Sequence, residues 1–299
     1  MTHTADVVIV GGGLIGLGIA WRAAERGLSV TVLDPTPGAG ASGAAAGMLA
    51  PVSELHYGER ALLQLNLASA RLFGGWAGQL QERTGVDIGY RTCGTVVIGW
   101  DRADLAGLRD LHAFQRELGL DAELLSSREL RQLEPDTAPG LPGGLLVPGD
   151  HQVDPRSLHT ALRAAGAAAG VRLRRHRATA AVVTGDRVSG VVLDNAELVG
   201  CDQLLLAGGA WIGELAGLPA EVRVPVRPVK GQTLQLRAQA PGLISRVIRG
   251  TVRGSPVYLV PRDDGRLVVG ASSEEAGFDT RARAGAVGRC TGSGTKLPL

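Results

Sequence analysis

The sequence predicts an α/β fold that begins with a Rossmann-type βαβ unit and adds an antiparallel, strand-rich domain. The apolar run Val7–Val10 leads directly into a glycine turn that reads G-x-G-x-x-G through Gly11, Gly13 and Gly16. An apolar helical pattern follows, and a second β-rich run ends in Asp34. Strand, glycine turn, helix, strand and acid therefore occur in the order that a dinucleotide-binding unit requires.

Each part of this unit has a physical reason. Gly11 permits a tight turn, Gly13 lets the backbone approach a pyrophosphate, and Gly16 lets the helix pack closely on the strand. The N–H groups and positive dipole at the start of the helix favour phosphates. Asp34 lies about 20 residues beyond the turn, where a carboxylate accepts hydrogen bonds from ribose hydroxyls. An acid at this place argues against a 2′-phosphate, so NADP is the least expected dinucleotide.

Composition indicates an ordinary globular protein. The 299 residues are 44% hydrophobic and 20% charged, which suggests about two domains and argues against disorder. A net charge of +2 gives no reason to expect nucleic acid. No signal peptide and no run of ~20 apolar residues occurs, and Cys93, Cys201 and Cys290 do not form a disulfide pattern. We therefore expect a cytoplasmic protein with reduced thiols and no membrane contact.

The segment from Pro37 to Met48 consists mostly of small residues and is too poor in polar ones to be a flexible linker. Side chains this small let a backbone lie against a large flat ligand. Apolar spacing then predicts one long helix over 59–84, in which Trp76 belongs to the core rather than to a ligand site.

Periodicity and proline positions predict the remaining elements. Residues 88–100 indicate a strand pair, 101–118 and 126–133 indicate helices, and 135–148 form a proline-rich loop region. Asp154 as N-cap and Pro155 at the first helical position predict a helix that continues over 156–170. The strands expected after it cover 171–177, the hairpin 180–183 and 188–193, an apolar strand from Leu204 into glycines, and then 222–229, 233–236, 257–260 and 267–269.

This order predicts a nucleotide-binding domain that a second domain interrupts. The expected segments are 1–85 and 151–217 for the nucleotide-binding domain, 86–150 and 218–287 for the substrate domain, and 288–299 for a divergent tail. The six histidines are scattered without metal-ligand spacing, so no metal site is predicted. Neither a G-x-S-x-G elbow nor a P-loop lysine supports a hydrolase or a kinase.

Six blocks of sequence occur in the order of one known family. They are the opening glycine turn, Ser42–Pro51, Gln152–Pro155, Ala207–Trp211, Pro228–Gln232, and Tyr258–Arg262 followed by Val269–Ser272. On these blocks the chain resembles the D-amino-acid oxidase superfamily of flavoproteins, and within it the glycine oxidases of thiamine biosynthesis, from residue 5 to about 287. The resemblance implies a glutathione-reductase-like domain that binds FAD rather than NAD.

The resemblance also implies roles for individual residues. It places the pyrophosphate on Gly11, Gly13, Leu14, Ile15 and Gly16, the adenosine ribose on Asp34 and Pro35, further phosphate contacts on Ala41 and Ser42, the flavin along Ala46, Gly47 and Met48, and the adenine near Ala180. Tyr258 is implied to hydrogen-bond the substrate carboxylate.

The implied reaction is oxidative deamination of glycine or a similar small amino acid, with reduction of O2 to H2O2. The flavin carries the chemistry, so no side chain is predicted as a catalytic acid or base. The alternatives are a related flavoenzyme for sarcosine or D-amino acids and an inactive FAD-binding remnant, with an NAD-dependent dehydrogenase more distant. The family resemblance also suggests that the protein forms a homo-oligomer.

The sequence departs from the family pattern near Val287. The family's substrate-binding arginine, in a motif like W-A-G-L-R-P, and its later glycine-rich flavin cover have no counterpart here. We therefore expect a truncated or frameshifted chain that lacks both. Arg249, Arg253 and Arg262 are alternative carboxylate clamps, for which bidentate capture requires a specific geometry.

Overall fold

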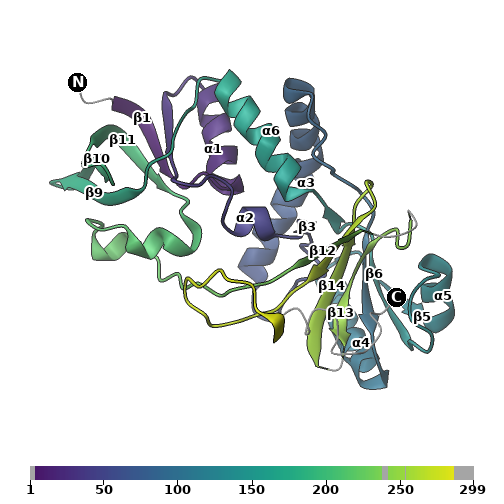
Figure 1. Ribbon diagram of the computed structural model, residues 1–299. Coiled ribbons are helices and arrows are strands. Elements are labelled where there is room, and N and C mark those ends of the chain that lie inside the picture. The colour runs from purple at the N-terminus through teal and green to yellow at the C-terminus, as the bar shows by residue number, and fades with distance from the viewer. Residues whose placement is uncertain (1–3, 238–241, 253, 286–299) are drawn as a thin grey trace.

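The computed structural model describes residues 4–237, 242–252 and 254–285, and it contains two large sheets at opposite sides of a central group of helices (Figure 1). The first sheet has six strands in the order β8 (Arg172–Arg174), β2 (Val30–Leu33), β1 (Thr4–Val10), β11 (Leu198–Leu206), β10 (Arg187–Leu193) and β9 (Ala178–Thr184). The strands from β8 to β11 run parallel, whereas β10 and β9 are antiparallel. The predicted βαβ unit is confirmed, because α1 (Leu14–Glu25) connects the parallel pair β1 and β2.

Helices cover one face of this sheet. They are α1, α3 (Arg60–Thr84) and α6 (Pro155–Ala168), which pack on alternate side chains of β1 such as Val7 and Ile9. Val8 points to the other face and joins a second buried cluster with Val191 and Val199. Burial on both faces explains why β1 is a continuous apolar run rather than an alternating one.

The second sheet has seven strands in the order β12 (Leu234–Arg237), β15 (Arg266–Gly270), β14 (Ser255–Pro261), β13 (Val247–Val252), β4 (Thr95–Gly99), β6 (Gly143–Val147) and β5 (Glu123–Ser126). Its neighbouring strands are antiparallel except for β13 and β4. These two strands come from distant segments, so their connection is long enough for the parallel pairing that a short hairpin forbids. Helices α4 (Arg102–Glu117) and α5 (Ser127–Leu133) belong to this half, and both begin with the capping boxes of Asp101 and Ser126.

Between the two sheets lie the short helix α2 (Ala41–Ala44) and a two-stranded ribbon of β3 (Met48–Leu49) and β7 (His151–Gln152). The predicted caps of α6 are confirmed, since the Asp154 carboxylate accepts from the N–H groups of Arg156 and Ser157 at 2.9 and 3.4 Å. The long helix α3 is also confirmed. Its Trp76 lies 5.9 Å from the ring of Trp21 and packs against the core, as predicted.

Several strand predictions are wrong. Residues 88–100 contain one strand, β4, preceded only by a bridge between Arg91 and Gln152. Residues 222–229 have no strand, although the 3₁₀ turn η2 (Ala220–Val222) precedes an extended stretch with exposed valines. An alternating pattern becomes a strand only when it pairs with another strand, and no described strand pairs with this stretch. The region 135–148 is not all loop, because it contains β6.

Strands β5 and β13 were not predicted. Strand β5 is a mostly exposed edge strand, and β13 carries Arg249 and Gly250, which weaken its apolar pattern. The 3₁₀ helix η1 (Gly209–Glu214) follows β11. Within the described residues, no helix is both long and apolar enough to cross a membrane. The predicted tail over 288–299 lies outside the described residues.

Candidate flavin and substrate site

The glycine turn lies where three backbone segments meet. Gly11 has φ +113°, and a Cβ on it would lie 2.2 Å from the Ala207 carbonyl oxygen at the end of β11. A Cβ on Gly16 would lie 1.9 Å from the Gly11 carbonyl oxygen. The turn, the first turn of α1 and the carboxyl end of β11 are therefore so close that only glycine fits at both positions. The predicted second strand that ends in glycines thus lies beside the first.

Asp34 closes the same turn from β2. Its carboxylate accepts from the Gly12 N–H at 2.6 Å and from the Thr36 N–H at 2.8 Å, with Pro35 between. An ionised carboxylate has about four acceptor positions, so two of them stay available to a ribose. The geometry fits the role expected for Asp34.

Ser42, in α2, contacts the start of α1. Its Oγ accepts from the Leu14 N–H at 3.1 Å and would lie 2.9 Å from a Cβ on Gly13. Helix α2, which begins with Ala41, is thereby held against the glycine turn. Ile15 is 71% exposed although it is apolar, at the helix end where phosphates are expected. The predicted phosphate contacts are thus neighbours in space.

The segment Ala46–Met48 is held by contacts with Gln152 and Val153. Gly47 has φ +76°, and a Cβ on it would lie 2.0 Å from the Val153 carbonyl oxygen. The Val153 N–H donates to the Gly47 carbonyl at 2.9 Å, and Met48 pairs with Gln152 in the β3–β7 ribbon. The backbone of this segment is therefore determined by contacts with residues that precede α6.

Tyr258 comes from the second sheet. It stands on β14 between Arg249 of β13 and Gly270 of β15. Its ring lies over Gly270, since a Cβ there would lie 2.3 Å from the tyrosine hydroxyl. Tyr258 and Met48 pack against one buried cluster, made of Ala46, Val247, Val260 and Val268. The tertiary structure thus brings the expected substrate residue to the expected flavin segment.

Ala180 lies on β9, opposite Val192 of β10 and bridged to Ala216. Strand β10 separates it from β11, so it stands towards the edge of the first sheet rather than at the glycine turn. Its expected contact with adenine stays a prediction.

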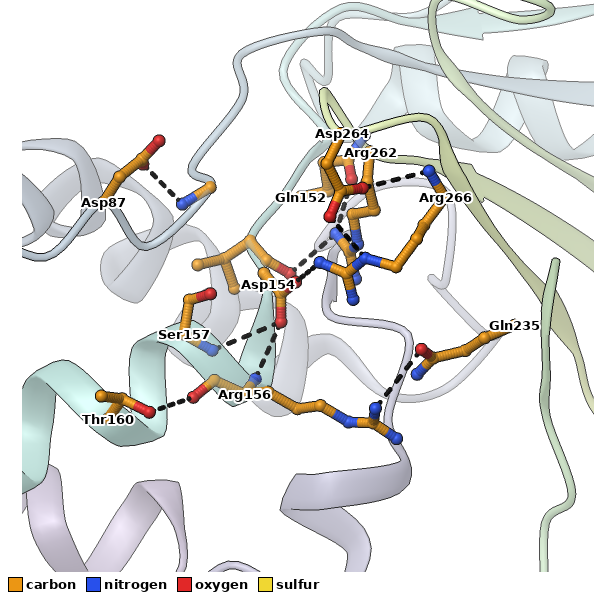
Figure 2. Close-up of polar contacts among 12 residues, drawn as sticks. Asp87, Gln152, Asp154, Arg156, Ser157, Thr160, Gln235, Arg262, Asp264 and Arg266 are labelled. Atoms are coloured by element: carbon orange, nitrogen blue, oxygen red, sulfur yellow. Dashed lines mark hydrogen bonds and ion pairs between the residues drawn. The ribbon is translucent and has the colours of Figure 1, made fainter. Parts of the chain in front are cut away.

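The candidate clamp arginines differ in their surroundings. Arg249 pairs with Glu54 at 2.8 Å, on the sheet face that carries Tyr258. Arg262 is buried, and its guanidinium donates to main-chain carbonyls and to Gln152 (Figure 2). Because its guanidinium is already bonded in this way, Arg262 lacks the geometry that bidentate capture of a substrate carboxylate requires. Arg253 lies outside the described residues.

Sequence reasoning missed two contributors to this region. His159 of α6 contacts the Gly12 carbonyl through Nε2 at 3.0 Å and lies against Gly38. Asp154 was predicted only as a cap, yet it also binds Arg266 at 2.7 Å. Burial raises the pKa of Asp154, but hydrogen bonds from Arg266 and Arg156 outweigh burial and leave that pKa below its usual value. Helical spacing alone could indicate on which face of α6 His159 lies, but not that this side chain contacts the Gly12 carbonyl.

Comparison with known proteins agrees with this geometry. Residues 6–290 match the model of the DAO family, described as FAD dependent oxidoreductase. The chain belongs to this family. The DAO family thus accounts for the fold, and FAD is the cofactor, as the resemblance implied. The close backbone contacts at Gly11 and Gly16, and the Asp34 carboxylate that accepts from the Gly12 N–H, are features that fit a dinucleotide.

Two sequence comparisons and one structural comparison define the relationship. Glycine oxidase of Geobacillus kaustophilus is 36% identical over 290 residues, which cover 96% of this chain and 75% of the relative. The bifunctional protein ThiO/ThiG of Synechocystis is 35% identical over 277 residues, 92% of this chain but 40% of that protein. The crystal structure of glycine oxidase from Geobacillus kaustophilus superposes with a TM-score of 0.90 at 32% identity, covering 98% of this chain and 77% of that one.

Proposed function

We propose that this chain oxidatively deaminates glycine or a similarly small amino acid, with FAD as cofactor and O2 as the final electron acceptor. The amino acid loses two electrons and two protons to become an imino acid, and O2 takes them up as H2O2. Hydrolysis of the imino acid from glycine gives glyoxylate and ammonia. The similarity to glycine oxidase and to ThiO/ThiG supports a role in thiamine (thiazole) biosynthesis.

One observation carries this proposal: Met48 and Tyr258 pack against the same buried cluster. Tyr258, whose hydroxyl can bind a carboxylate, therefore packs on the same cluster as the segment proposed to face the flavin. When bound, FAD supplies the acceptor for the hydride from the substrate Cα. The protein's part is orientation, in which the Tyr258 hydroxyl donates to the carboxylate and the small residues of 46–48 leave room for the ring.

Cofactor contacts are part of the proposal. We assign the pyrophosphate to the glycine turn with Ser42, the ribose to Asp34, and the flavin to the segment Ala46–Met48. The proposed domains, 1–85 with 151–217 and 86–150 with 218–287, follow the segments from which each sheet takes its strands.

The test is the visible spectrum of the purified protein, followed by glycine under anaerobic conditions. A flavin band that bleaches with glycine, together with peroxide release in air, is the expected result. A parallel panel of sarcosine, D-alanine and D-proline separates glycine oxidation from the related activities. Bound flavin that no amine of the panel bleaches would contradict the proposed function.

A further inference from the structure

Arg262 is a buried cation whose hydrogen bonds go to neutral groups. It is 8% exposed and directly follows β14. One guanidinium nitrogen donates to Oε1 of Gln152 at 2.6 Å and to the Val153 carbonyl at 3.0 Å, and the other donates to the Ala46 carbonyl. Nε is buried without a partner. Burying a charge is costly, and the nearby carboxylates of Asp154 and Asp264 offset only part of the effect of burial on the pKa of Arg262.

The acceptors of Arg262 belong to the segment that we assign to the flavin and to the segment that pairs with it. Ala46 begins the segment that we assign to the flavin, and Gln152 pairs with Met48 across the ribbon. The Val153 carbonyl that Arg262 binds is also the atom that a Cβ on Gly47 would strike. The planar guanidinium therefore joins the residue before Gly47 to Gln152 and Val153 of the neighbouring segment.

A neighbouring arginine offers a natural comparison. Arg266 lies on the same β14–β15 hairpin and binds Asp154 and Asp264 at 2.7 and 2.6 Å (Figure 2). Its bonds thus go to carboxylates rather than to the flavin-facing backbone. The two arginines have the same charge and lie close together, but Arg262 binds neutral acceptors and Arg266 binds carboxylates.

We propose that Arg262 is a positioning residue for the flavin, which holds the backbone of Ala46–Met48 in the shape that receives the ring. This inference rests on the proposed flavin placement. The second sheet thereby contributes to cofactor binding as well as to substrate binding, through a residue that does not touch the substrate.

The experiment compares Arg262→Met, Arg262→Lys and the control Arg266→Met. FAD is titrated into each apoprotein, and the Kd, the shape of the visible flavin band and the thermal unfolding of the apoprotein are recorded. We expect Arg262→Met to weaken FAD binding at least about tenfold and to make the bound flavin band resemble that of free FAD. Arg262→Lys keeps the charge without the planar fork and should weaken binding by a smaller factor. Arg266→Met should change the FAD Kd by less than about threefold.

A wild-type Kd and a wild-type spectrum in Arg262→Met would overturn the inference, even if the apoprotein were less stable. If that variant does not fold, Arg262→Lys decides, and an unchanged Kd and spectrum there would also overturn it. These readouts are independent of the substrate. Wild-type protein that binds FAD but oxidises no amine would contradict the proposed function and leave the role of Arg262 supported or refuted by the Kd values.

Discussion

The Asp34 carboxylate accepts a hydrogen bond from the Gly12 N–H at 2.6 Å, so the acid at the end of β2 orders the glycine turn after β1. This hydrogen bond joins the turn after β1 to the residue after β2, and it does not require a ligand. In the free protein Asp34 orders the glycine turn. By our proposal it also accepts hydrogen bonds from the ribose of bound FAD.

Replacing Asp34 by alanine should remove both contributions. We expect FAD to bind about 10- to 100-fold more weakly, because hydrogen bonds to a charged group are lost on the protein and on the cofactor side. Asp6→Asn is the control, since Asp6 accepts from the N–H and the hydroxyl of Ser29 at 2.6 and 2.7 Å on the same sheet, away from the turn. Equal Kd values for FAD in the wild type and Asp34→Ala would contradict the assignment.

Two glycines of α1 should respond in opposite ways to alanine. Gly16→Ala places a Cβ 1.9 Å from the Gly11 carbonyl oxygen, so we expect a loss of about 3 kcal/mol or more in unfolding free energy. Gly18→Ala meets no atom within 4 Å and should stabilise the helix by about 0.5–1 kcal/mol. Denaturant unfolding measures both, and similar losses for the two variants would argue against the tight packing at Gly16.

Tyr258→Phe should impair substrate binding and leave FAD in place. Loss of a hydrogen bond to the substrate carboxylate predicts a kcat/KM for glycine lowered about 10- to 100-fold, mainly through KM. Steady-state peroxide release measures this effect, and flavin absorbance per polypeptide reports cofactor content. Tyr90→Phe serves as the matched control, since Tyr90 packs on Phe73 of α3 with ring centroids 5.2 Å apart, and it should leave KM unchanged. An unchanged KM in Tyr258→Phe would contradict the proposed hydrogen bond between Tyr258 and the substrate.

Glu197 should contribute to acid sensitivity. Hydrogen bonds from the Arg174 guanidinium, at 2.7 and 2.5 Å, lower the pKa of Glu197 to about 2. A carboxyl whose pKa is depressed in the folded state stabilises the fold above its unfolded pKa and loses this contribution as pH falls towards the folded value. The difference in unfolding free energy between wild type and Glu197→Gln should therefore shrink between about pH 4.5 and 2. A difference that does not change with pH in this range would show that the pair is not linked to folding.

Local patterns were sufficient for much of the fold. The caps of α6 at Asp154 and the long helix α3 follow from spacing, because each depends on contacts within a few residues. The glycine turn, Asp34 and Ser42 make contacts across longer separations, and the order of the motif predicted their place. The strands β13 and β5 and the absent strand over 222–229 could not be predicted in this way, because strand formation depends on the partner edge that the tertiary structure supplies.

The site as a whole shows the same division. The sequence by itself predicted a dinucleotide-binding unit followed by a small-residue segment and, by resemblance, a substrate-binding role for Tyr258. Only the tertiary structure decided that Tyr258 and Met48 share one buried cluster and that Arg262 is bound to Ala46, Gln152 and Val153. Those contacts join segments that are far apart in the chain, and their geometry is set by how the two sheets pack, which no local pattern encodes.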